Sequence, residues 1–135
     1  MTITIETTVS APPATAWKAW TTPDSITQWN FASDDWACPR ATIDLRPGGK
    51  FSYRMEAKDG SMGFDFEGEF TAVDLNRRIE FSLWDDRKAA IEFVPVAEGT
   101  RISESFEAED VHSAEEQRQG WQAILNNFKK LVDGR

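Results

Sequence analysis

The segment from Ser113 to Gly134, SAEEQRQGWQAILNNFKKLVDG, decides the fold. Ser113 and Glu116 form a capping-box pattern at its start, where a hydroxyl can accept a hydrogen bond from a free backbone N–H. Lys129 and Lys130 lie in the last turn, where cations complement the helix dipole, and Gly134 is typical of a helix end. The apolar side chains between them recur every three or four residues, as on one face of an α-helix: Trp121, Ile124, Leu125, Phe128, Leu131 and Val132. The pattern predicts one long helix whose apolar stripe needs a surface to cover.

The chain before this helix is predicted to form strands separated by turns. Residues 2–10 alternate between apolar and polar side chains, as in a half-buried strand, and six segments between residues 41 and 106 alternate likewise. Turn signals such as Asp59-Gly60 separate these segments. In the longest of them, Gly68 falls on the apolar face and could allow a bend or bulge. The other residues expected on that face are Met62, Phe64, Phe66, Phe70 and Ala72. This predicts an antiparallel meander with one dry face.

Two short helices are predicted between the first strand and the meander. Pro12-Pro13 ends the strand and can open a helix, in which Trp17 and Trp20 share one face as expected core residues. Thr22-Pro23-Asp24 is typical of a second helix start, with Thr as N-cap and an acidic residue near the positive end of the helix dipole. We therefore expect one α+β domain over residues 1–135, in which the C-terminal helix covers a curved antiparallel sheet.

Charge and composition exclude several classes of function. The net charge of −8 repels phosphate backbones and anionic lipid, so we expect neither nucleic acid nor a membrane surface as a partner. With one cysteine, Cys38, and one histidine, His112, the common zinc motifs are absent, and we expect no metal or cofactor. A lone cysteine also allows no intrachain disulfide, which suits a reducing cytosol. The alternating N-terminus is no signal peptide and no apolar run approaches the ~18 residues that span a bilayer, so we expect a cytoplasmic protein.

Aromatic side chains are the main candidates for contacting a ligand. Trp29, Phe31 and Trp36 flank residues 30–40, which fit no period and are expected to form a loop at the mouth of a pocket. A second set is expected to point into the space between sheet and helix: Tyr53, Met55, Phe64, Phe66, Trp121, Leu125 and Phe128. The sequence leaves open whether this space is a pocket or solid core. A glycine inside a helix costs roughly 1 kcal/mol relative to Ala. The presence of Gly120 therefore favours either a close approach of another part of the chain or room for a ligand there.

Glu104 is the most informative ionisable residue and the one candidate for catalysis. It shares strand parity with Ile102 and Phe106, which predicts that its carboxyl points inward. Burial would then raise its pKa unless a partner such as Arg54 or a ligand group compensates. In that position it could act as a general base or orient a ligand hydroxyl. The alternative is a glutamate at a strand end, or on a bulge that turns the side chain outward.

Several local motifs occur in the order of a known family. They are Pro12–Trp20, Thr22-Pro23-Asp24 with Gln28-Trp29, Asp44–Gly49, Met55 with Asp59-Gly60, Gly99-Thr100-Arg101, and Gly120-Trp121 with Leu125, Phe128 and Leu131. In these the chain resembles the START/Bet v 1-like (SRPBCC) superfamily, and within it the activator-of-Hsp90-ATPase homologue (AHSA1-like) proteins of bacteria. The resemblance implies a helix-grip fold and a pocket that in relatives holds apolar or aromatic small molecules. Glu104 departs from the pattern, since relatives tend to have an apolar residue there.

Three functions are compatible with these residues. The preferred hypothesis is a domain that binds an apolar or aromatic small molecule, because the dry face is aromatic and no standard catalytic set is present. The second is a cyclase- or hydrolase-type enzyme that uses Glu104 with Tyr53 or Asn30 as polar partner. The third is a protein-interaction module of the co-chaperone type, although nothing in the chain corresponds to the further N-terminal domain of that co-chaperone. A homodimer is also left open.

Overall fold

The strands form one antiparallel sheet that curls around the long C-terminal helix. The computed structural model describes residues 1–134. Over this range the elements are β1 (Thr2–Val9), α1 (Pro13–Thr21), α2 (Pro23–Trp29), β2 (Trp36–Ala37), β3 (Ala41–Ile43), β4 (Lys50–Ala57), β5 (Gly63–Asp74), β6 (Arg78–Leu83), β7 (Lys88–Val96), β8 (Gly99–Glu107) and α3 (Ala114–Asp133). The strand order is β1-β8-β7-β6-β5-β4-β2, and β3 also pairs with β4.

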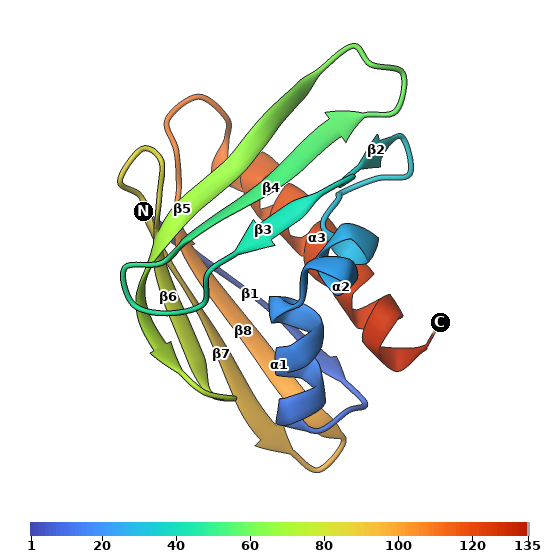
Figure 1. The fold of residues 1–135 in the computed structure, drawn as a ribbon, viewed down its shortest axis with the longest axis vertical. Coiled ribbons are helices and arrows are strands. Elements are labelled where there is room, and N and C mark those ends of the chain that lie inside the picture. The colour runs from blue at the N-terminus through green and yellow to red at the C-terminus, as the bar shows by residue number, and fades with distance from the viewer. Residues whose placement is uncertain (135) are drawn as a thin grey trace.

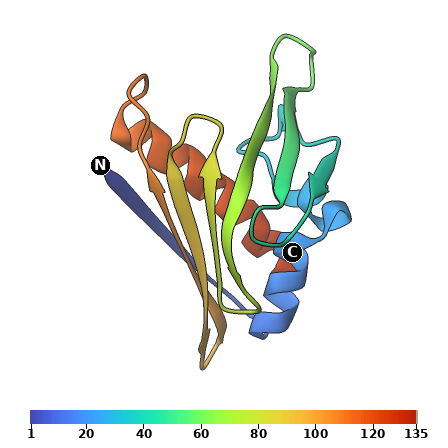
Figure 2. The ribbon, with the colours of Figure 1, turned by 60° about the vertical axis from the view of Figure 1, so that its left-hand side comes forward.

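The arrangement confirms the predicted α+β fold, with two short N-terminal helices and a long C-terminal helix packed across a curved sheet. Figure 1 shows α1 and α2 together near the C-terminal end of α3. Turning the molecule brings the strands in front of α3, which crosses behind them from one side of the sheet to the other (Figure 2). The two short helices therefore cover only one end of the space between the sheet and α3.

The predicted signals at both ends of α3 are confirmed. At the N-terminus, the backbone N–H of Glu116 donates to the Ser113 hydroxyl oxygen at 3.1 Å. At the C-terminus, Gly134 adopts the left-handed conformation with φ of 78°, and its N–H donates to the Leu131 carbonyl. Because both ends are satisfied by local groups, the length of the helix is fixed by its own sequence.

Side chains of α3 also cover the exposed edge of β1. Three of them donate hydrogen bonds to alternate carbonyl oxygens of this strand: Arg118 to Thr4, Gln122 to Glu6, and Lys129 to Thr8. The other edge of β1 pairs with β8 along its full length. Since these carbonyls point away from β8, the helix satisfies acceptors that the sheet leaves free.

A bulge in β5 corrects one prediction about the dry face. Phe70 lies opposite Phe81, but the register then shifts, so that Val73 lies opposite Ile79 and Ala72 opposite Glu80. Phe70 and Ala72 therefore do not share a face, because one extra residue reverses the alternation after it. The bulge follows Phe70 and is not at Gly68. A side chain at Gly68 would instead collide with the backbone carbonyl of Ser82 and with the ring of Phe51.

The segment 30–40, predicted to be a loop, contains the two-residue strand β2. Trp36 and Ala37 pair with Ala57 and Glu56 at the end of β4. Two residues are too few to show the alternation by which a strand is detected in a sequence. The pairing joins the segment before β3 to β4, at the edge of the sheet.

Candidate functional site

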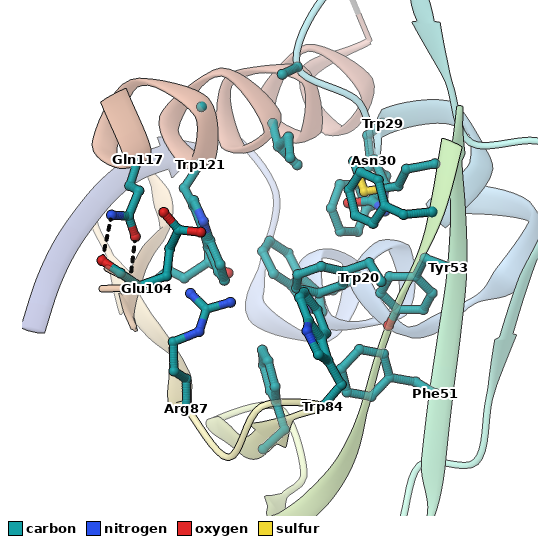
Figure 3. Close-up of a pocket in the computed structure, with 18 of the residues that line it drawn as sticks. Trp20, Trp29, Asn30, Phe51, Tyr53, Trp84, Arg87, Glu104, Gln117 and Trp121 are labelled. Carbon is teal, nitrogen blue, oxygen red and sulfur yellow. Dashed lines mark hydrogen bonds between the residues drawn. The ribbon is translucent and has the colours of Figure 1, made fainter. Parts of the chain in front are cut away.

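A cavity of about 490 Å³ lies between the sheet and the N-terminal half of α3. Strands β4, β5, β6 and β8 supply most of one wall, and the helix residues that border the cavity are Glu116, Gln117, Gly120, Trp121 and Ile124. Figure 3 shows Glu104, Arg87, Gln117 and Trp121 on one side of the cavity and Asn30, Tyr53 and Phe51 on the other. The volume falls within the range of pockets that hold small molecules in proteins.

The wall of the cavity is mainly aromatic. On α3, Trp121 stacks on Phe106 with ring centroids 3.9 Å apart and planes 9° apart, and it meets Phe66 edge-on. Phe66 in turn meets Trp84 edge-on, at 5.5 Å between centroids. Aromatic pairs in these geometries hold one another in fixed orientations, so the wall is preformed. The aromatic residues that border the cavity are Trp20, Trp29, Phe51, Tyr53, Phe64, Phe66, Phe70, Phe81, Trp84 and Trp121.

The cavity brings together seven of the eleven residues proposed as ligand contacts. These are Trp29, Tyr53, Met55, Phe64, Phe66, Glu104 and Trp121. Trp29 was expected at the mouth but is only 2% exposed, and its indole N–H donates to the Ala19 carbonyl at 3.0 Å. It lies at the closed end because α2 packs against α1 there.

Four of the proposed ligand contacts do not border the cavity. Leu125 and Phe128 are fully buried, and Phe128 packs edge-on against Trp20 and Trp29. They occupy the part of α3 that α1 and α2 cover, so this stretch of the stripe is solid core. The remaining two lie beside the cavity: Trp36 is near Phe64, with ring centroids 6.2 Å apart, and the Phe31 carbonyl accepts a hydrogen bond from Asn127.

Sequence reasoning missed two groups of cavity residues. Phe51 and Phe81 were placed on the dry face by their alternation, but nothing in the sequence distinguished them from core. Trp84 and Arg87 come from the turn between β6 and β7, whose sequence indicates only a connection between two strands. Trp84 is 53% exposed, and the Arg87 guanidinium carbon lies 5.6 Å from its ring centroid. A tryptophan beside a turn was the one available signal for this part of the rim.

Glu104 is buried with no protein partner. It is 6% exposed, lies between Ile5 of β1 and Ile91 of β7, and borders the cavity. No residue of the range 1–134 makes a hydrogen bond or ion pair with its carboxyl, and burial raises its pKa to about 8. The inward orientation agrees with its strand parity. The proposed partner Arg54 instead lies on the outer face, with Glu56 at 3.1 Å and Asp65 at 3.5 Å.

Tyr53 and Asn30 supply polar groups on the other side of the cavity. Burial raises the pKa of the Tyr53 hydroxyl, and the neighbouring Cys38 and Glu104 raise it further. Asn30 is 5% exposed, and its side-chain nitrogen donates to the Cys38 sulfur at 3.9 Å. Burial also raises the pKa of the Cys38 thiol, which is the opposite of what a reactive cysteine requires.

Charged side chains surround the mouth of the cavity, and most are already paired. Glu109 accepts hydrogen bonds from the backbone and ring nitrogens of His112, which lower the pKa of the Glu109 carboxyl. Arg87 forms an ion pair with Asp85 at 2.7 Å. The Ser113 hydroxyl donates to Glu116 at 3.1 Å. The rim therefore differs from Glu104, whose carboxyl has no such partner.

Neither a metal centre nor a membrane segment emerges from the described residues. No three His, Cys, Asp or Glu side chains of residues 1–134 come together as metal ligands. In the same range, every helix is too short or too polar to cross a bilayer.

Comparisons with known proteins match this geometry to a family. The family model described as Activator of Hsp90 ATPase homolog 1-like protein matches residues 10–133. The solution structure of the AHSA1-like protein from Aeromonas hydrophila is 42% identical, with a TM-score of 0.94 over 99% of this chain and 93% of that chain. A protein from Cytophaga hutchinsonii is 45% identical, with a TM-score of 0.84 over 98% and 92% of the two chains. One from Chromobacterium violaceum, 23% identical with a TM-score of 0.86 over 98% of both chains, shows the fold alone. None of the curated proteins is significantly similar to the chain.

Proposed function

We propose that this chain, which belongs to the family of AHSA1-like proteins, binds a small apolar or aromatic molecule in the cavity between its sheet and α3. The observation that carries the proposal is the cavity itself, which combines about 490 Å³ of space with an aromatic wall. Apolar ligand surface that leaves water for such a space contributes roughly 25 cal/mol per Å² to binding. The stacked and edge-on rings of the wall give a ligand a preformed site.

The polar groups of the lining would orient the ligand. Glu104 stands on one side and Tyr53 with Asn30 on the other, all within a mainly apolar surface. A few polar groups in an apolar pocket cost little when a ligand satisfies them and cost more when it does not. We therefore expect selection among ligands of similar size by the position of their polar atoms.

Tryptophan fluorescence and native mass spectrometry test the proposal directly. Trp20, Trp29, Trp84 and Trp121 border the cavity, so a bound ligand should change the emission of the protein. We expect saturable binding from at least one member of a panel of lipids, polyphenols and aromatic amines. Native mass spectrometry of the purified protein should then show that ligand at one equivalent. Emission and mass unchanged by every member of the panel would contradict the proposal.

Two variants at neighbouring positions test whether the ligand binds in the cavity. Gly120 borders the cavity, and a side chain begun there meets no atom within 4 Å. Gly120→Phe should fill part of the space and weaken binding. Gln119→Phe adds the same ring one position away, at an exposed site, and should leave binding unchanged. Equal affinities for the two variants would place the ligand elsewhere on the protein.

A second candidate function is catalysis by Glu104. The observation that favours it is the inward carboxyl with a pKa near 8, because a general acid or base works best when its pKa is close to the operating pH. The Tyr53 hydroxyl borders the same cavity and could bind the reacting group. Turnover of a bound ligand by the wild-type protein, lost in Glu104→Gln with binding retained, would support this candidate.

A further inference from the structure

We propose that the ligand of this cavity carries an ammonium group that pairs with the carboxyl of Glu104, on an apolar or aromatic body that fills the rest of the space. The proposal rests on the proposed function, since it names the chemistry of a ligand in the same cavity. It would make the protein a receptor or carrier for small hydrophobic amines.

The Glu104 carboxyl has no cationic partner among the described residues. It lies on β8, with Ile5 of β1 and Ile91 of β7 beside it and Ile102 and Phe106 on the same strand. No cation of residues 1–134 forms an ion pair with it, although the rim carboxylates all have partners. The carboxyl is open to the cavity, so a cation brought by a ligand can reach it and supply both charge and N–H donors that the protein does not provide.

An aromatic surface lies next to that carboxyl. Trp121 lies beside Glu104 in the cavity wall (Figure 3) and is itself fixed by its stack on Phe106. The negative faces of aromatic rings attract cations, most strongly in places that exclude water. A carboxylate beside indole and phenyl rings thus offers an ammonium group attraction from two kinds of partner. An alcohol or an ether would gain only the hydrogen bond.

The charges around the cavity also favour a cationic ligand over an anionic one. The other titratable groups that border the cavity are Tyr53 from β4, Arg87 from the β6–β7 turn, Glu109 and His112 from the segment before α3, and Glu116 from α3. Arg87, the one permanent cation among them, is paired with Asp85. A ligand carboxylate would keep the Glu104 carboxyl in its protonated form, because two negative charges in a space of low dielectric repel strongly. The net charge of −8 further attracts cations toward the mouth.

Binding of an ammonium ion should release a proton from the protein. At pH 7 most of the Glu104 carboxyl is protonated, because burial raises its pKa to about 8. When the ammonium ion binds, the O–H bond of the carboxyl breaks, the proton passes to water, and the carboxylate accepts N–H hydrogen bonds from the ligand. The ligand keeps its own proton throughout. The release is roughly one proton per ligand at pH 7 and falls toward zero above pH 9.

Three ligands with one skeleton test the proposal by calorimetry: 4-phenylbutylamine, 4-phenylbutan-1-ol and 4-phenylbutyrate. We expect the amine to bind at least about tenfold more tightly than the alcohol, and the acid more weakly than both. Titrations of the wild-type protein in two buffers of different ionisation enthalpy should show proton release with the amine alone. This readout needs no variant, so it does not depend on how a substitution at Glu104 affects folding.

Glu104→Gln should remove the preference for the amine and leave the affinity for the alcohol within about threefold. Glu67→Gln is the matched control, because it removes the same charge from the exposed face of β5 and should retain the preference. Equal binding of amine and alcohol by the wild-type protein, or amine binding without proton release, would overturn the assignment of an ammonium ligand. If the alcohol or the acid still binds when the ammonium assignment fails, the proposal that the cavity binds a small apolar or aromatic molecule stands. Failure of all three to bind, together with failure of the wider panel, would overturn both.

Discussion

The two halves of α3 carry the same apolar stripe but serve different purposes. In the C-terminal half, Leu125 and Phe128 are fully buried, and Phe128 meets Trp20 and Trp29 edge-on. In the N-terminal half, Gly120 and Trp121 face a cavity. The cover also differs between the two halves, because α1 and α2 close only one end. In this fold, the position of the cavity is therefore set by where the short helices stop.

The largest expected effect is at the closed end. Phe128→Ala should lower the free energy of unfolding by about 3–5 kcal/mol, because the lost ring leaves a void among packed aromatic side chains. Chemical denaturation followed by fluorescence at constant pH measures this loss. A loss below about 1 kcal/mol would mean that the closed end is not solid core, and the contrast between the two halves would disappear.

The next effect concerns Glu104 at the open end and depends on pH. Its carboxyl ionises near pH 4.5 when exposed and near pH 8 in the folded protein, so between these values the folded state holds more protons than the unfolded state. The contribution of Glu104 to stability is therefore most favourable below about pH 4.5, falls as the pH rises toward 8, and is constant above it. We expect a loss on the order of 2–4 kcal/mol across this window.

Glu104→Gln provides the comparison, because the amide does not titrate. The difference in unfolding free energy between wild type and this variant should change in favour of the variant from pH 5 to pH 8. Denaturation curves of both proteins at four or five pH values give the difference directly, and other titrating groups cancel. A constant difference over this range would show that the carboxyl is solvated in the folded protein.

Trp121→Ala is expected to have a smaller effect on stability than Phe128→Ala. Trp121 is half-buried and already borders empty space, so its removal enlarges a cavity rather than creating one. The stack on Phe106 would be lost, which is worth about 0.5–1.5 kcal/mol beyond the buried area. We expect a total loss of about 1–2 kcal/mol, together with altered ligand binding. A loss equal to that of Phe128→Ala would place both residues in one continuous core.

The smallest effect has the opposite sign. Gly120→Ala should stabilise the protein by about 0.5–1 kcal/mol, because alanine favours the helix and a methyl group there meets no atom within 4 Å. Gly68→Ala is the control, since a methyl group at that position collides with the Ser82 carbonyl and the Phe51 ring, and it should destabilise. Thermal denaturation is sensitive enough for both. Destabilisation by Gly120→Ala would indicate that the open half of α3 is closely packed after all.

Much of the fold was predictable because its signals are local. The ends of α3 follow from Ser113 and Gly134, and the inward orientation of Glu104 follows from simple alternation along β8. The bulge after Phe70 was not predictable, because no residue type in that strand requires it. For the space between the sheet and α3, the sequence allowed two outcomes, a cavity or solid core, and did not decide between them. Whether Phe128 is core and Trp121 is wall depends on how far α2 reaches along α3, which is a property of the assembled structure.

The cover of the β1 edge by α3 has a consequence for the synthesis of the protein. Thr4 and its hydrogen-bond partner Arg118 are 114 residues apart, so β1 is translated well before the helix that covers its edge. At ribosomal speeds of 5–20 residues per second the delay is roughly 10 s. During this time the free carbonyls of β1 can recruit a strand from another nascent chain, and the apolar face of the sheet is uncovered. Newly made chains should therefore be most prone to aggregation just before α3 leaves the ribosome, and the mature protein should be resistant to it at this edge.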